Sequence, residues 1–301
     1  MQRLNEHFTI YNYRDAADKA ALMTEAAKHV RAICTNGSAW VTSLLDALPK
    51  LEVIACTSTG YDEFDMAALR RRNIRLCHST GMSEKDVPDL AMALLLGAAR
   101  RMTWAERYVR SGEWMVKGRA PTTTRVCGKK LGIVGLGSIG RAVARRASGF
   151  DMEISYQGPN RKTDVPYRYY ASVVEMARDV DFLLMACIGG PTTVGIANAE
   201  VFKALGPTGI FINIARGSCV DQDALLAALH NGAIAGAGLD VYAHEPQDPK
   251  PFEGLDNVVL TPHYANGTPD TRRDMFNIAI ENLLAFFAGR PLLTPVPETP
   301  N

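Results

Sequence analysis

The sequence predicts an α/β protein made of two Rossmann-like domains, each built on a doubly wound parallel sheet. Short apolar runs alternate with helical patterns along nearly the whole chain, which is typical of βαβ units. A second and clearer series of the same kind begins at Lys130. The chain has 301 residues, 47% of them hydrophobic, which exceeds one ordinary domain, so we expect two.

The first series contains four apolar runs that we predict to be strands. They cover residues 8–11, 31–35, 51–56 and 74–77. Helical patterns follow at residues 62–71 and 86–110. The second of these is long and rich in Ala and Leu, so we expect it to link the two domains.

The second series supplies six strands, which complete a dinucleotide-binding fold. They cover residues 131–134, 153–156, 182–185, 210–214, 237–241 and 258–260. A last helix is predicted at 269–288, and we expect it to cross back and pack on the first domain. The substrate-binding domain then comprises residues 1–96 and 268–301, and the dinucleotide-binding domain comprises residues 97–267.

Composition excludes several classes of partner. Lys and Arg number 33 against 32 Asp and Glu, and the charges are scattered, so no field favours nucleic acid or an anionic membrane. No apolar run reaches transmembrane length, and the polar start lacks the apolar core of a secretory signal. The six cysteines lie far apart without a Cys-x-x-Cys pair, so we expect no metal site and a reducing, cytoplasmic location.

A glycine-rich turn follows the first strand of the second series. Gly135, Gly137 and Gly140 form a G-x-G-x-x-G pattern in which the first glycine permits the tight turn. The second lets a pyrophosphate approach the backbone, and the third allows helix and strand to pack closely. Ser138 and Ile139 open the following helix, whose free N–H groups attract phosphate. A plain turn is the alternative, but strand, turn, helix and next strand in register favour a dinucleotide site.

The next strand ends without the acidic residue that would hold the ribose hydroxyls of NAD. Gln157 stands there instead, and Asn160, Arg161 and Lys162 follow. No carboxylate repels a 2′-phosphate, and two cations stand close enough to bind it. We therefore expect NADP(H) to be preferred, with NAD(H) as a second coenzyme. The alternative is that Arg161 and Lys162 belong to a solvated loop.

Three residues near successive strand ends form a candidate reaction set. Arg216 offers a planar guanidinium that suits a carboxylate. Reduction of a ketone leaves charge on oxygen, and His263 as imidazolium can supply the proton. Glu245 is the candidate carboxylate that stabilises the charged ring. Each alone would be an ordinary polar residue, as we take His78 and His244 to be, but their joint placement favours chemistry.

At these residues the sequence resembles the D-isomer-specific 2-hydroxyacid dehydrogenases, within them the hydroxypyruvate and glyoxylate reductase branch. The motifs that carry the resemblance are Gly-Leu-Gly-Ser-Ile-Gly at 135–140, Asn-Ile-Ala-Arg-Gly-Ser at 213–218, Gly-Leu-Asp-Val-Tyr at 238–242 with Glu-Pro at 245–246, and Thr-Pro-His at 261–263. The likeness runs over nearly the whole chain and implies reduction of a small 2-oxo acid, such as glyoxylate or hydroxypyruvate, to the D-2-hydroxy acid.

The resemblance also implies residue roles. Arg216 would hold the substrate carboxylate, with Glu245 and His263 as the acid/base pair. Asp240 and Ala215 would lie near the bound coenzyme.

Further roles implied by the resemblance concern the first domain and the assembly. Thr59 and Gly60 would offer backbone N–H groups to the substrate carboxylate in an interdomain cleft that closes over it. A homodimer joined through an arm near residues 103–119 is also implied. Met82 and Tyr264 depart from the usual pattern, and we expect them to reshape the pocket.

Two other functions remain open from the sequence. A nucleotide-sensing binding protein of the corepressor kind shares this fold and can retain the same residues. Formate oxidation also uses the fold but expects Gln where Glu245 stands, because that reaction needs no proton exchange.

Overall fold

The computed structural model describes residues 2–37 and 39–300. It divides the chain into two compact units, which we call the first unit (Met1–Ser83 with Gly267–Asn301) and the second unit (Glu84–Asn266). The boundary predicted from the sequence lies later, after residue 96. Helix α5 (Asp86–Ala99) packs on α8 (Ser138–Ser148) and on strands β8 (Ile210–Asn213) and β9 (Gly236–Leu239), which groups its residues with the second unit.

The first unit has a three-stranded parallel sheet in the order β1-β2-β3. Its strands are β1 (Ala32–Thr35), β2 (Val53–Cys56) and β3 (Arg75–Cys77), so three of the four predicted strands are confirmed. The helices of this unit are α1 (Gln2–Asn5), α2 (Lys19–His29), α3 (Ala39–Leu44), α4 (Met66–Arg71) and α12 (Pro269–Phe287).

Alternation along β2 divides the core of the first unit between two faces. Val53 and Ala55 pack with residues of α12, whereas Ile54 and Cys56 pack with residues of α3 and α4. The predicted crossing of the last helix back to the first domain is therefore confirmed.

The predicted strand at 8–11 is wrong. Residues 8–11 have no strand geometry, and Phe8 and Ile10 pack instead in the cluster that includes α12. The ring centroid of Phe8 lies 5.4 Å from that of Phe287. Partial burial of these two side chains in this cluster satisfies the apolar pattern without any strand pairing.

The second unit has a seven-stranded parallel sheet in the order β10-β9-β8-β7-β4-β5-β6. All six predicted strands are present, with bounds within two residues. The strands are β4 (Lys130–Val134), β5 (Glu153–Gln157), β6 (Arg168–Tyr170), β7 (Phe182–Met185), β8 (Ile210–Asn213), β9 (Gly236–Leu239) and β10 (Val258–Leu260). The order reverses at β4, and ligands of such sheets generally bind beyond the carboxyl ends of the strands at this point.

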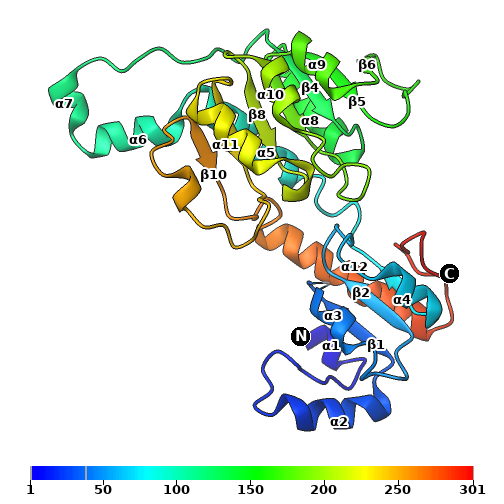
Figure 1. The fold of residues 1–301 in the computed structure, drawn as a ribbon. Helices are drawn as coiled ribbons and strands as arrows, with labels where there is room; N and C mark the ends of the chain where they lie inside the picture. The colour runs from blue at the N-terminus through cyan, green and yellow to red at the C-terminus, as the bar shows by residue number, and fades with distance from the viewer. Residues whose placement is uncertain (1, 38, 301) are drawn as a thin grey trace. The chain divides into compact units, whose positions relative to one another are not determined.

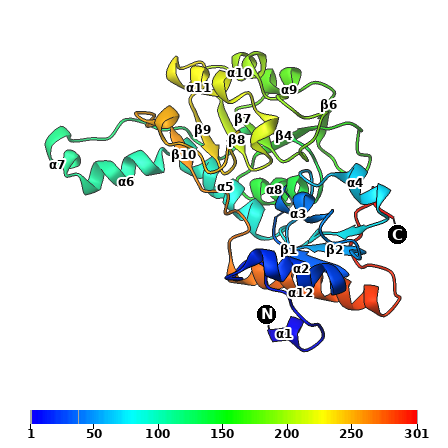
Figure 2. The same ribbon diagram turned by 60° about the horizontal axis from the view of Figure 1, so that its bottom comes forward.

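Helices cover both faces of this sheet (Figures 1 and 2), so the second unit has three layers. On one face α5 and α8 enclose one apolar cluster, and on the other α9, α10 and α11 enclose a second. The remaining helices of the unit are α6 (Met102–Arg110), α7 (Glu113–Lys117), α8 (Ser138–Ser148), α9 (Val173–Asp179), α10 (Ala199–Leu205) and α11 (Gln222–His230), with short 3-10 turns η1 (Gly217–Cys219) and η2 (Lys250–Phe252).

The predicted helix at 86–110 is in fact two helices. Arg101 adopts a left-handed conformation with φ of 50°, which interrupts the helix between α5 and α6. Beyond this break α6 and α7 project from the second unit as an arm (Figure 1). Within the described residues, no helix is long and apolar enough to cross a membrane.

Candidate active site

The three glycines after β4 have three different surroundings. Gly135 has φ of 94°, and a methyl group on it would lie 2.6 Å from the backbone nitrogen of Cys187. A methyl group on Gly140 would lie 2.2 Å from the carbonyl oxygen of Gly135, so this helix packs too closely for any side chain. Gly137 has no atom within 4 Å of such a methyl group. The open space at Gly137, at the start of α8, fits a pyrophosphate that bonds to backbone N–H groups.

The loop after β5 is held in place by two tyrosine hydroxyls. The backbone N–H of Lys162 donates to Tyr156 Oη at 2.6 Å, and Tyr169 Oη donates to the carbonyl of Gly158 at 3.1 Å. The side chains of Arg161 and Lys162 are exposed on this ordered loop.

One acidic residue of this loop is already paired. Asp164 forms an ion pair with Arg141 of α8 at 3.0 Å, and the hydrogen bond from Arg141 lowers the pKa of this carboxyl. Gln157 and Asn160 stand where the sequence analysis placed them, at the end of β5 and on the loop.

A buried amide shapes the turn that carries Arg216. The Asn213 Oδ1 atom accepts from the N–H of Ala215 at 3.0 Å, and its Nδ2 donates to the carbonyl of Arg216 at 3.1 Å. Asn213 is 1% exposed, so water competes little for these bonds. The Arg216 Nη1 atom donates to the Ala215 carbonyl at 2.7 Å, which fixes the direction of the guanidinium.

This turn lies against the loop that carries Glu245. A methyl group on Gly217 would lie 1.7 Å from the carbonyl oxygen of Tyr242, so only glycine allows the two backbones to approach this closely. Gly217 thus brings Arg216 next to the segment that follows β9.

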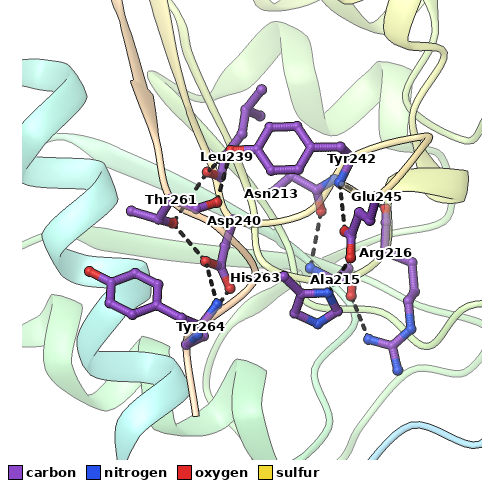
Figure 3. Close-up of polar contacts among 11 residues, drawn as sticks. Asn213, Ala215, Arg216, Leu239, Asp240, Tyr242, Glu245, Thr261, His263 and Tyr264 are labelled. Atoms are coloured by element: carbon purple, nitrogen blue, oxygen red, sulfur yellow. Dashed lines mark hydrogen bonds and ion pairs between the residues drawn. The ribbon is translucent and has the colours of Figure 1, made fainter. Parts of the chain in front are cut away.

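His263 and Glu245 form a direct pair (Figure 3). His263 Nδ1 lies 2.5 Å from Glu245 Oε2, and Glu245 Oε1 accepts from the N–H of Tyr242 at 3.0 Å. The two side chains are 49% and 34% exposed, so the pair is accessible to a small molecule. Because Glu245 occupies Nδ1, the Nε2 atom is the one from which His263 can release a proton outward.

A buried carboxylate holds the turn that carries His263. Asp240 is 1% exposed and accepts from the Thr261 hydroxyl at 2.6 Å and from the N–H groups of Tyr264 and Ala265 at 3.1 Å each. Burial raises the pKa of Asp240, although these hydrogen bonds act in the opposite direction. His263 has φ of 48°, and the donors that converge on Asp240 hold the turn in this left-handed conformation.

The structure thus places nearly all the predicted site residues on the second unit. Thr59 and Gly60 follow β2 in the first unit, so their predicted contact with the substrate stays a prediction. Thr59 Oγ1 lies 2.9 Å from Ser83 Oγ, and the Thr59 carbonyl lies 2.8 Å from Nδ1 of His78, which the sequence analysis had set aside.

No role was predicted from sequence for three residues that organise the site, namely Asn213, Gly217 and Tyr242. All three lie within the quoted motifs, but their side chains do not suggest chemistry. Residues 2–37 and 39–300 contain no group of three or more His, Cys, Asp or Glu that could hold a metal ion.

Comparison with known proteins identifies the family. Residues 92–265 match the sequence profile described as D-isomer specific 2-hydroxyacid dehydrogenase, NAD binding domain. The chain belongs to this family. The predicted family and fold class are confirmed, and this dehydrogenase is an oxidoreductase that uses a nicotinamide dinucleotide.

Relatives of this dehydrogenase match over nearly its whole length. A hydroxyphenylpyruvate reductase of Plectranthus scutellarioides is 43% identical over 98% of this chain and 94% of its own. A glyoxylate/hydroxypyruvate reductase of Arabidopsis thaliana is 44% identical over 90% of this chain and 84% of its own. An NADPH-dependent glyoxylate/hydroxypyruvate reductase of Sinorhizobium meliloti, solved with NADP and malonate, superposes with a TM-score of 0.91 at 39% identity and covers 99% of this chain and 93% of its own.

Proposed function

We propose that this dehydrogenase reduces small 2-oxo acids such as glyoxylate and hydroxypyruvate to D-2-hydroxy acids, with NADPH as the preferred coenzyme and NADH as a second one. The observation that carries the proposal is the His263–Glu245 pair at 2.5 Å beside the Arg216 turn, on the unit that holds the glycine-rich loop. A nicotinamide, when bound, supplies the hydride.

His263 is the proton donor in this proposal. Glu245 bonds to Nδ1, which directs Nε2 toward the ketone oxygen and stabilises the charged ring before transfer. As charge develops on the oxygen, Nε2 releases its proton to it, and Glu245 keeps the ring oriented. The same atoms act in reverse when the hydroxy acid is oxidised.

Arg216 binds the substrate carboxylate in this proposal. Its Nη1 atom is anchored on the Ala215 carbonyl at 2.7 Å, and a guanidinium held in one plane suits a planar carboxylate. The predicted N–H groups of Thr59 and Gly60 would add donors to the same carboxylate.

The loop after β5 supports the preference for NADPH. Gln157 brings no negative charge to the strand end, Arg161 and Lys162 are exposed, and Asp164 is neutralised by Arg141. A 2′-phosphate carries nearly two negative charges, so these cations favour it over a hydroxyl. The relative from Sinorhizobium meliloti is named as NADPH-dependent, which supports the same choice.

A panel of 2-oxo acids tests the proposed function. We expect oxidation of NADPH, followed at 340 nm, with glyoxylate and hydroxypyruvate, and slower oxidation with NADH. Hydroxyphenylpyruvate belongs in the panel because one relative is named for it. Coenzyme binding without turnover of any 2-oxo acid would contradict the proposal and favour a nucleotide-sensing protein.

We also infer that the enzyme is a cytoplasmic homodimer joined through the α6–α7 arm. Trp114, Met115 and Val116 on this arm are 57%, 92% and 86% exposed, an apolar surface that favours burial against a second copy. The six cysteines are free, which fits a reducing compartment. Light scattering should give twice the mass of the chain, and Met115→Asp should reduce it to that of one chain.

A further inference from the structure

Tyr242 contacts each of the three segments that carry the candidate catalytic residues. Its backbone N–H donates to Glu245 Oε1 at 3.0 Å, which restrains the carboxylate from the side opposite to His263. The oxygen that faces His263 is the other one, Oε2, at 2.5 Å from Nδ1. The direction of the carboxylate therefore depends in part on where the backbone of Tyr242 lies.

The hydroxyl of Tyr242 reaches the neighbouring strand. It donates to the Thr261 carbonyl at 2.8 Å and lies 3.2 Å from the Leu239 carbonyl (Figure 3). Thr261 is two residues before His263. One side chain therefore connects the loop of Glu245 to the segment of His263, and both ends of the connection are hydrogen bonds.

The ring between these two ends is fixed by packing. Tyr242 is 9% exposed, and its ring meets that of Phe252 edge-on, with centroids 6.1 Å apart. Burial raises the pKa of Tyr242 to about 12, so its hydroxyl remains a donor over the whole working range of the enzyme. A buried ring of this kind has few rotamers, so the position of the Tyr242 hydroxyl and the position of its backbone depend on each other.

The carbonyl of Tyr242 meets the third segment. It lies against Gly217, where a methyl group would come within 1.7 Å of its oxygen. Movement of Tyr242 therefore also alters the position of the turn that carries Arg216.

We propose that Tyr242 is the positioning residue of the site and that its hydroxyl, through Thr261, sets the distance between His263 and Glu245. The proposal rests on the proposed function in so far as this pair is taken as the acid/base pair. Asp240 independently holds the turn after His263, so loss of the hydroxyl should loosen the pair without dismantling it.

The variant Tyr242→Phe tests the proposal because it keeps the ring and the backbone N–H and removes only the hydroxyl. We expect kcat for glyoxylate to fall about 3-fold to 10-fold, the size of effect that one neutral hydrogen bond has. The KM of NADPH should change by less than about twofold, since no coenzyme contact is removed.

Tyr170→Phe is the matched control. Tyr170 is 8% exposed, its hydroxyl donates to Asp179 at 2.6 Å, and its pKa is also raised to about 12, mainly by burial. It lies on β6, at the other edge of the sheet from β10. The melting temperature of Tyr170→Phe should fall by about as much as that of Tyr242→Phe, and its kcat should equal the wild-type value.

A second measurement does not depend on turnover. The NMR signal of the proton on His263 Nδ1, assigned with His263→Gln, should move upfield in Tyr242→Phe, because a longer hydrogen bond to Glu245 deshields this proton less. The signal should be unchanged in Tyr170→Phe.

The outcomes separate this proposal from the proposed function. Wild-type kcat, or an unshifted signal of the His263 Nδ1 proton, in Tyr242→Phe would overturn the positioning role, as would an equal loss of kcat in Tyr170→Phe. Failure of the wild-type enzyme to reduce any 2-oxo acid would overturn the proposed function, while this NMR signal would still decide whether Tyr242 positions the pair. In a Glu245→Gln background the effect of Tyr242→Phe on kcat should shrink, because the pair it positions is already disrupted.

Discussion

Gly217→Ala is the substitution for which the structure predicts the largest effect from the smallest change. The added methyl group would lie 1.7 Å from the carbonyl oxygen of Tyr242. The backbone fixes the position of the methyl carbon, and the oxygen is itself a backbone atom, so no flexible side chain can move aside. Non-bonded heavy atoms prefer separations of about 3.5–4.0 Å, so the two segments must move apart by about 1.8 Å. That movement separates Arg216 from the loop of Glu245.

The size of the effect follows from this displacement. A misplacement of about 1 Å at reacting groups costs about 100-fold in rate. We therefore expect kcat/KM for the 2-oxo acid to fall at least about 100-fold, with a higher KM because Arg216 no longer reaches the carboxylate. Coenzyme binding should persist, since the glycine-rich loop belongs to a different segment of the chain and keeps its own packing.

Steady-state kinetics with glyoxylate measure the loss of kcat/KM in Gly217→Ala, and a fluorescence titration with NADPH measures whether coenzyme binding persists. Gly97→Ala on α5 is the control, because its methyl group would meet Val259 Cγ2 at 3.4 Å, an ordinary contact, and alanine suits a helix interior. Activity of Gly217→Ala within about fivefold of wild type would refute the reasoning, because it would mean that the two backbones separate without displacing the site.

Three further predictions concern residues of the site. Arg216→Lys should lower kcat/KM about 10-fold to 100-fold by raising KM and reducing kcat, because an ammonium cannot reproduce two parallel hydrogen bonds. If the wild-type enzyme reduced aldehydes that lack a carboxylate as fast as it reduces glyoxylate, Arg216 would not have this role. His263→Ala should lower kcat about 100-fold or more with NADPH binding retained in a fluorescence titration, and near-normal turnover would exclude it as the proton donor. Replacing Arg161 and Lys162 together by Ala should reduce kcat/KM with NADPH about 10-fold to several hundredfold and leave NADH nearly unchanged, and added salt should narrow the wild-type margin. Gln157→Asp should recover use of NADH. If the double substitution left the ratio of kcat/KM with NADPH to kcat/KM with NADH unaltered, the side chains of Arg161 and Lys162 would be solvated and would not contact the coenzyme.

Strands were predictable where both faces of the sheet are covered. The run at 182–185 matches β7 residue for residue, because a strand between two helical layers is continuously apolar. The run at 258–260 matches β10, an edge strand whose three residues are all apolar. The other edge strand, β6, was missed because Arg168–Tyr170 has no apolar run. An edge strand of this kind owes its conformation to its neighbour rather than to its own composition.

Local pattern also failed where tertiary packing decides. The left-handed Arg101 that ends α5 stands in a sequence with ordinary helical propensities, with neither glycine nor proline at the break. The run at 8–11 has the composition of a strand, but Phe8 and Ile10 pack, partly buried, in the cluster that includes residues of α12, more than 250 residues away in sequence.

The residues of the candidate site also divide into those that could be identified from the sequence and those that could not. Arg216, Glu245 and His263 could be selected from sequence because their side chains have reactive groups and follow strand ends. Asn213 acts through its side-chain amide, and Tyr242 acts through its backbone N–H and its hydroxyl. The partners of these groups are fixed only by the fold. Their contribution became visible only with the distances.

The buried carboxylate of Asp240 has a consequence for motion. Loops at the ends of strands usually exchange their amide protons quickly, but the N–H groups of Tyr264 and Ala265 are bonded to a carboxylate that is 1% exposed. These two amides should therefore exchange with solvent as slowly as those of the adjacent strands. The segment around His263 is therefore ordered once, when the chain folds. Its ordering adds no free-energy cost to the individual catalytic cycles.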